Sequence, residues 1–321
     1  MGAGRDDGQN ENLRARLVDA TTGRNLWADS FSASDPGKVY DELTDKIVGS
    51  VAGEEGRIRT QEYAKAWSKD PVDLDEYDYY LRGHDLFMRF ESKDTNNQAY
   101  RIWHDGSLKY PDSQLLKIAM AWYFYADAAW FWQNEGGTDY KLAEEYAREV
   151  LYGASHASLQ IERLGHSLLA AVYANTADGN PSRFQEALKE AKKAVEISPY
   201  DTFMLGGLSS IAARAGDREV ALEWIERARN HSPRFENYWA LSMIEYIGQN
   251  YDAALSAAEQ ENRPYLQRDK LILLASILMK KGETERARAI VGELAKDTDL
   301  VTAKLSQGGY SYSDPNILRQ Q

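Results

Sequence analysis

The sequence contains no cysteine, and this absence excludes disulfide bonds, thiolate metal sites and a cysteine nucleophile. Proline is sparse, with 8 residues in a chain of 321. Basic residues are outnumbered by acidic ones, 38 to 50, so the formal net charge is −12. A surface of this charge repels phosphate groups. We therefore expect no nucleic-acid partner and a weak preference for basic partners.

The chain also lacks a long hydrophobic run. Its most apolar stretch, from Leu115 to Trp132, is interrupted by Lys117 and Asp127 and predicts a buried helix, too polar to span a membrane. The opening seven residues have no apolar core of the kind that marks a signal peptide. We expect a chain without a membrane span, located in the cytoplasm by default, with the periplasm as the alternative for an anchored parent protein.

The first fifty residues differ in character from the rest. Residues 1–10 are rich in glycine but lack the Lys-Ser/Thr of a phosphate loop, which predicts a disordered lead. Over 12–32, apolar and polar residues alternate on both sides of a Thr-Thr-Gly turn, and this pattern predicts a β-hairpin. Asp35 and Pro36 are typical of a helix start. That helix has one apolar face, formed by Val39, Leu43, Ile47 and Val51.

From Asp70 to about residue 296 the sequence predicts one helix after another, and the helices repeat. The clearest unit, over about 202–235, has leucines in a first helix, glycine in the turn, small residues in a second helix and a closing proline: Leu205, Leu208, Gly216, Ala221, Ile225, Ala228 and Pro233. The preceding unit repeats the second half at the same offsets, with Ala187, Ala191, Ala194 and Pro199. Later units place Ala253 and Ala287 five residues after Gly248 and Gly282.

Two antiparallel helices in about 34 residues, with small residues at their crossing, are typical of the tetratricopeptide repeat. Small residues let the two backbones approach, and stacked hairpins bury a continuous core while leaving a concave groove. The sequence therefore predicts an all-α fold. It is a right-handed α-solenoid of about six tetratricopeptide-like hairpins, preceded by a short β-hairpin plus helix.

Three short motifs resemble a known arrangement: Leu17 to Gly23, Leu26-Trp27, and Tyr77 to Gly83. Together with the repeats, they are similar to the C-terminal region of bacterial signalling proteins that carry a TolB-like domain followed by tetratricopeptide repeats. These include class III adenylate cyclases and membrane-anchored transcription regulators. The resemblance implies a TolB-like remnant over 11–68, repeats over 69–296 and a capping segment over 297–321. It also implies that any cyclase domain lies outside this chain.

Two groups of residues carry side chains of the kind that bind metal ions. Asp70, Asp73, Asp75 and Asp78 lie where a helix is expected to start, and acidic residues there complement the helix dipole. Helix capping is therefore favoured over a calcium site, which needs alternating ligands around a glycine. The five histidines show no spacing typical of zinc. We expect no metal and no cofactor.

Aromatic residues crowd one short stretch: Trp122, Tyr123, Phe124, Tyr125, Trp130, Phe131 and Trp132. They occupy every face of a helix, so most are expected to pack between neighbouring hairpins. The alternative is a stacking surface for a sugar or peptide, which would make this helix a small-molecule site, as in some sugar-acting helical barrels.

The first helix of each repeat is expected to line the concave side, and the same offsets then select partner-binding residues in three successive units. These residues are Phe203, Ser210, Arg214, Phe235, Tyr238, Ser242, Tyr246, Asp269 and Lys280. Some tetratricopeptide domains bind the C-terminal carboxylate of a peptide with Lys and Asn at two positions of the first helix. This chain has Gly206 and Ser210 at those positions. The set favours a partly apolar peptide or helix in the groove. The alternative is that these positions merely face solvent.

The sequence thus predicts a non-catalytic protein–protein interaction scaffold or sensor module of a bacterial signalling protein. The resemblance leaves two alternatives open. The chain is part of an adenylate cyclase whose catalytic domain lies elsewhere, or it is the regulatory half of a transcription regulator.

Overall fold

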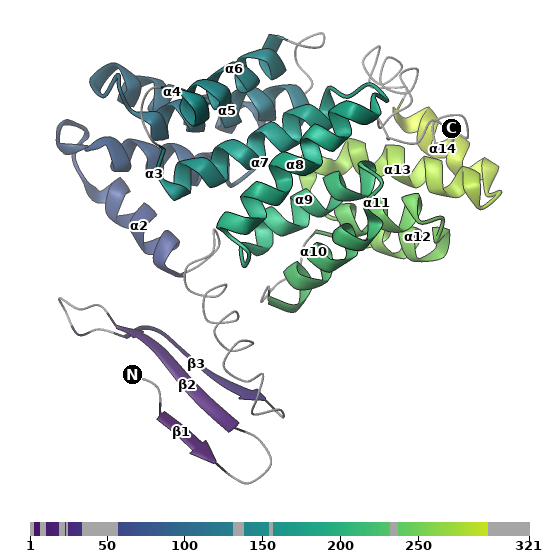
Figure 1. Cartoon of the computed structure of the whole chain (residues 1–321), viewed down its shortest axis with the longest axis horizontal. Helices are drawn as coiled ribbons and strands as arrows, with labels where there is room; N and C mark the ends of the chain where they lie inside the picture. Colours follow the sequence, from purple (N-terminus) through teal and green to yellow (C-terminus); the bar gives the residue numbers. More distant parts are fainter. Residues whose placement is uncertain are drawn as a thin grey trace.

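A computed structural model describes residues 3–6, 11–18, 23, 25–33, 57–130, 138–153, 157–231 and 237–294. These residues form a small antiparallel sheet and a long array of helices (Figure 1). The helix expected over 35–51 and the capping segment expected over 297–321 lie outside the described residues.

The sheet has three strands in the order β1-β2-β3, namely β1 (Ala3–Asp6), β2 (Glu11–Val18) and β3 (Asn25–Ala33). β2 and β3 pair antiparallel over the stretch for which a hairpin was expected, with Arg14 opposite Ser30. The structure differs from the expectation of a disordered lead in one respect, because Ala3–Asp6 pairs with β2. A strand edge carries unpaired backbone groups, and β1 satisfies those on one side of β2.

The helices follow one another in pairs along the chain. The array begins with α2 (Arg57–Ser68) and the short 3-10 helix η1 (Pro71–Asp73). The first three pairs are α3 (Glu76–Phe87) with α4 (Lys93–Lys109), α5 (Gln114–Ala129) with α6 (Thr138–Tyr152), and α7 (Leu159–Asn175) with α8 (Pro181–Ile197). The last three pairs are α9 (Thr202–Arg214) with α10 (Arg218–His231), α11 (Tyr238–Ile247) with α12 (Tyr251–Gln260), and α13 (Gln267–Lys280) with α14 (Thr284–Leu294), the last pair being preceded by the short 3-10 helix η2 (Pro264–Leu266).

Side-chain caps explain where several helices begin. The helix expected at Asp70 starts instead at Glu76, because Asp75 and Asp78 form a reciprocal capping box and Pro71 begins only a 3-10 turn. Each carboxylate accepts the other residue's backbone N–H at 2.9 Å. Asp75 and Asp78 are therefore engaged in capping, the role that the sequence favoured for this acidic group.

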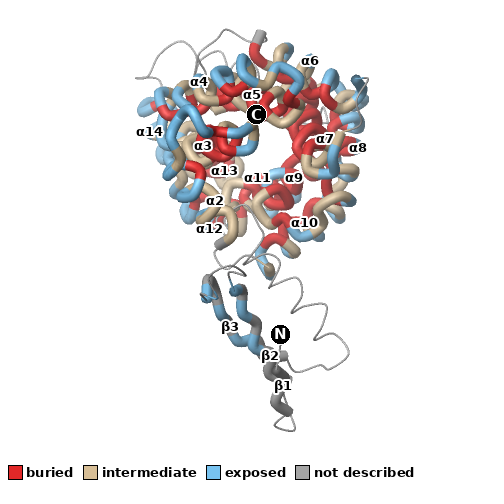
Figure 2. The backbone as a smooth tube through the Cα atoms, turned by 90° about the vertical axis from the view of Figure 1, so that its left-hand side faces the viewer, coloured by how far each residue is buried: buried red, intermediate tan, exposed pale blue. Residues whose placement is uncertain are grey.

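The array has an inner and an outer layer. Each odd-numbered helix contacts the next odd-numbered one, from α3 through α5, α7, α9 and α11 to α13. In Figure 2 the helices α7, α9, α11 and α13 lie nearer the centre than α8, α10, α12 and α14. The described helical residues therefore form an all-helical array in which sequential neighbours pack side by side, as in an α-solenoid.

Small residues are buried where paired helices cross, as expected. Ala187, Ala191, Ala194, Ala221 and Ala228 are each 0% exposed. Ala253 is an exception, being half-buried, while its neighbour Ala254 is 0% exposed. The reason is a shift of one residue in this unit.

The shift arises in the turn between the two helices. The left-handed residue there is Gln249 (φ 61°), whereas the units directly before and after it use Gly216 (φ 87°) and Gly282 (φ 79°). Counting five residues from Gln249 gives Ala254, the fully buried position. The offsets counted from Gly248 were therefore wrong by one residue.

Most of the aromatic residues of α5 join neighbouring helices. Trp122 donates its indole N–H to the Leu164 carbonyl at 3.3 Å, which ties α5 to α7. Tyr123 stacks on Tyr100 of α4 with ring centroids 4.4 Å apart. The expected packing role is therefore observed for these residues, whereas Phe131 and Trp132 lie outside the described residues.

Candidate functional site

Four half-buried aromatic rings from different hairpins meet on the inner face of the array. We call Phe90, Trp130, Phe203 and Tyr265 the inner aromatic cluster. The Phe90 ring stacks on Tyr265 at a centroid distance of 4.5 Å and on Phe203 at 6.1 Å, and it meets Trp130 edge-on at 5.0 Å. Trp130 also contacts Tyr265 at 5.3 Å. The cluster thus joins parts of the array that are far apart in sequence.

All members of the cluster sit at helix ends. Phe90 follows α3, Trp130 is the C-terminal cap of α5, Phe203 is the second residue of α9, and Tyr265 lies in η2 just before α13. Helix ends are where the backbone changes direction, so side chains there can point along the inner face and reach one another across it.

Tyr265 is positioned by a buried ion pair. The Glu261 carboxylate, 1% exposed, receives N–H bonds from Arg263 at 2.6 and 2.8 Å and from the Trp239 backbone at 2.8 Å. Arg263 in turn donates to the Tyr265 hydroxyl at 3.2 Å. Burial opposes ionisation of Glu261, but the bonds from Arg263 outweigh it and lower the pKa of this carboxyl.

A polar network lies beside the cluster. Arg214 donates to the Asn175 side-chain oxygen at 2.9 Å and to the Ala174 carbonyl at 2.6 Å, so it satisfies the C-terminal end of α7. Asn175 donates to the Tyr125 hydroxyl at 3.1 Å, and the Tyr125 ring meets Trp130 at 5.6 Å. Burial raises the pKa of Tyr125 to about 12, so this phenol stays neutral.

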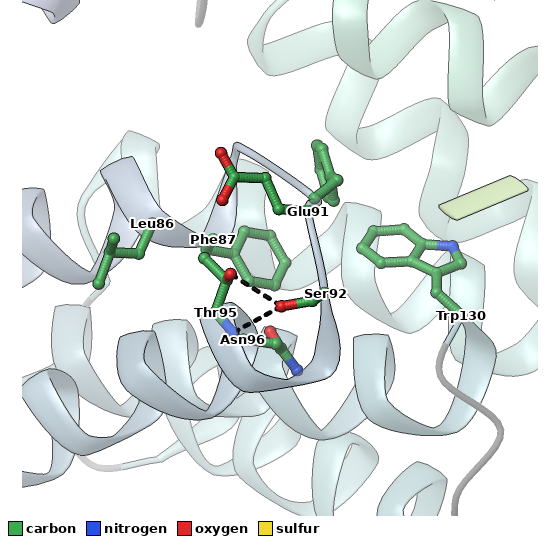
Figure 3. Close-up of a pocket in the computed structure, with 8 residues that line it drawn as sticks. Leu86, Phe87, Glu91, Ser92, Thr95, Asn96 and Trp130 are labelled. Carbon is green, nitrogen blue, oxygen red and sulfur yellow. Dashed lines mark hydrogen bonds between the residues drawn. The ribbon is translucent and has the colours of Figure 1, made fainter. Parts of the chain in front are cut away.

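A narrow pocket with no room for a water molecule lies beside Phe90 and Trp130 (Figure 3). It is lined by Leu86, Phe87, Phe90, Glu91, Ser92, Thr95, Asn96 and Trp130. The Ser92 hydroxyl accepts the Thr95 N–H at 3.1 Å and so caps α4. Asn96 is 4% exposed, and within the described part of the chain its side-chain nitrogen has no hydrogen-bond partner. The pocket therefore combines aromatic walls with one unsatisfied donor.

The structure brings one of the partner-binding residues expected from sequence into the cluster, namely Phe203. Tyr238 and Lys280 are half-buried, and burial lowers the pKa of the Lys280 ammonium. Asp269 is 8% exposed, and Phe235 lies outside the described residues.

The other expected groove residues serve packing. Ser210 and Arg214 are 4% and 6% exposed and bond to backbone carbonyls of α9 and α7. Ser242 is 0% exposed and donates to the Ala254 carbonyl, and Tyr246 is 4% exposed. With the one-residue shift in this unit, Ser242 and Tyr246 correspond to the buried Ser209 and Ala213. The shift does not account for their burial, because Ser210 and Arg214, from which the offsets were counted, are buried as well.

Three members of the cluster were missed by sequence reasoning as groove residues: Phe90, Trp130 and Tyr265. Phe90 and Tyr265 lie in connections between helices, outside the repeated offsets. Trp130 was grouped with the packing aromatics. Their convergence depends on how the array closes, which local spacing does not encode.

The described residues contain no group of three or more His, Asp or Glu side chains placed to hold a metal ion. None of the helices in the described ranges is long and apolar enough to cross a membrane. No protein-family model matches the chain, and a search of curated proteins likewise gives no match.

Proposed function

We propose that the chain is a non-catalytic protein–protein interaction module that binds a peptide or helix on the inner face of the array. The observation that carries this proposal is the convergence of four half-buried aromatic rings, from separate hairpins, on one place. Aromatic residues are enriched among those that dominate binding energy, because they present a large rigid surface at low entropic cost.

The same proposal covers the finer nature of the fold. The paired helices are about six tetratricopeptide-like repeats wound into a right-handed solenoid. Such arrays present extended inner surfaces to partners. From the resemblance of the sequence, we propose that the module belongs to a bacterial signalling protein, where it acts as the scaffold or sensor half and catalysis belongs to another domain.

Selection of random 16-residue peptides displayed on phage tests this function. Enriched peptides are synthesised, and their dissociation constants are measured against the parent chain and against Phe203→Arg. Placing a charge in the aromatic cluster is expected to weaken binding by about thirty-fold, which corresponds to a loss of about 2 kcal/mol at an interface hot spot.

Leu108→Arg is the matched control, because Leu108 of α4 is 71% exposed and lies away from the cluster. Both variants are first checked for native helicity by circular dichroism. Equal binding by the parent chain and Phe203→Arg, or the failure of any peptide to bind the parent chain, contradicts the proposal.

A further inference from the structure

Phe90 has an unusual backbone for an aromatic residue. Its φ is 50°, in the left-handed region that favours glycine, and the corresponding connections of later hairpins use Gly216 and Gly282 there. Among the described non-glycine residues, only Asp178 and Gln249 share this conformation. A bulky side chain in this region costs on the order of 1 kcal/mol. Some interaction of the ring must offset that cost.

The contacts of the Phe90 ring compensate for the cost of this backbone conformation. Phe90 packs against Phe87 of its own hairpin at 5.6 Å and against three rings from other hairpins, those of Trp130, Phe203 and Tyr265. An aromatic ring inserted among rings from separate elements is the geometry of an anchor side chain in a recognition site. In this case the anchor belongs to the protein itself.

We infer that Phe90 is an internal occupant of the recognition site: its ring holds the position that an aromatic side chain of the partner takes, and the partner expels it. This inference rests on the proposed peptide-binding function and names the chemistry of the partner's anchor. The contact is autoinhibitory, because a partner must compete with Phe90 before it can bind.

Several features favour exchange of one ring for another. The residues on either side of Phe90, Arg89 and Glu91, are both exposed, so the connection can move without opening the core. Leaving the site releases the backbone strain of Phe90. Within the described residues, the buried amide nitrogen of Asn96 has no hydrogen-bond partner, and it lines the pocket that departure of the Phe90 ring would open to the incoming peptide.

The test uses the phage-selected peptides with the parent chain and Phe90→Gly. Glycine removes the ring and adopts the left-handed backbone freely. If the Phe90 ring blocks the site, its removal raises the fraction of molecules whose site is free to bind peptide and lowers the dissociation constant roughly three- to ten-fold. Gln249→Gly is the matched control, since it relieves the same backbone conformation in an exposed turn of another hairpin and is expected to leave affinity unchanged. Replacing the peptide's aromatic residue by alanine is expected to abolish binding.

A second measurement keeps an aromatic ring at position 90. 4-Fluorophenylalanine at position 90 reports the environment of the ring by ¹⁹F NMR, and saturating peptide is expected to shift its resonance to that of an exposed ring. Unchanged or weaker affinity of Phe90→Gly together with an unmoved resonance overturns the inference, while the proposed function stands if peptides still bind at Phe203. If no peptide binds either chain, both fall. If Phe90→Gly fails to fold, the ¹⁹F resonance alone decides.

Discussion

The ring of Phe90 stacks on that of Tyr265 with centroids 4.5 Å apart and planes inclined by 29°. The first residue follows α3 at the start of the array, and the second precedes α13 near its end. In a simple solenoid each repeat contacts only its neighbours. This pair instead links distant repeats, so it closes the array and places an aromatic surface inside it.

We predict that Phe90 and Tyr265 are energetically coupled. Phe90→Ala and Tyr265→Ala, alone and combined, should give a coupling of about 0.5–1.5 kcal/mol in the free energy of unfolding, because aromatic pairs of this geometry contribute that much beyond burial. Urea denaturation followed by circular dichroism measures it. The pair Phe90 and Tyr152, of which Tyr152 is 56% exposed on α6, should show additive effects. If the effects of Phe90→Ala and Tyr265→Ala on the free energy of unfolding were also additive, this would contradict the closure of the array by these two rings.

Two glycines in helices should respond oppositely to alanine. A Cβ on Gly83 would lie 2.2 Å from the indole nitrogen of Trp103, which is 1% exposed and donates to the Tyr80 carbonyl at 3.1 Å. Gly83→Ala should therefore lower stability by about 2–4 kcal/mol through overpacking and loss of this bond. Gly207→Ala meets nothing within 4 Å and should raise stability by about 0.5–1 kcal/mol. Thermal and urea unfolding of both variants check this, and a tolerated Gly83→Ala would refute the described α3–α4 packing.

Arg214 is predicted to support the fold. Arg214→Ala should destabilise the chain by about 2–4 kcal/mol, because it deprives the α7 carbonyl of Ala174 and the Asn175 side chain of a charged donor. Arg214→Lys should restore little, since an ammonium cannot reproduce the planar fork. Arg229→Ala, at an exposed arginine of α10, should stay within about 0.5 kcal/mol of the parent. Similar stability for Arg214→Ala and Arg229→Ala would argue against the network.

Glu261 should make stability sensitive to acid. Its folded pKa lies below the ordinary value of 4.5, because the bonds from Arg263 outweigh the cost of burial. The unfolded chain therefore binds the proton more readily than the folded chain. The stabilisation that ionised Glu261 gives the folded state is thus complete above about pH 4.5 and is lost as the pH falls through the folded pKa. Urea unfolding between pH 3 and 7 should show this loss, and Glu261→Gln should flatten it. Glu226→Gln, at an exposed carboxylate, should keep the parent slope; an equal slope in all three chains would be inconsistent with this assignment.

Local rules in the sequence anticipated much of the helical array. Alanines at the crossings and aspartates at helix starts act over a few residues, so the burial of Ala221 and the capping role of Asp75 could be interpreted directly, although the helix itself was expected to start at Asp70. The same reasoning failed by one residue where Gln249 adopts the left-handed conformation usually taken by glycine. Ser242 and Tyr246 were expected on the inner surface and are buried, as are Ser210 and Arg214 of the preceding unit, because each inner helix packs against its hairpin partner and against the next inner helix.

The candidate site was less accessible to sequence reasoning. Phe203 was expected to line the groove because it lies in the first helix of the clearest repeat, but Phe90 and Tyr265 lie in connections whose contacts depend on the curvature of the whole array. Curvature accumulates from small rotations at each helix interface and has no local signature.

Hydrogen–deuterium exchange of the parent chain, with and without a saturating selected peptide, shows whether the inner aromatic cluster is where the peptide binds. Recognition by the inner aromatic cluster predicts slower exchange at Thr202–Gly206 and at Pro264–Asp269, together with faster exchange around Phe90 as its ring is expelled. Slower exchange confined to the outer helices α10 or α12, with no change at the cluster, would contradict the account.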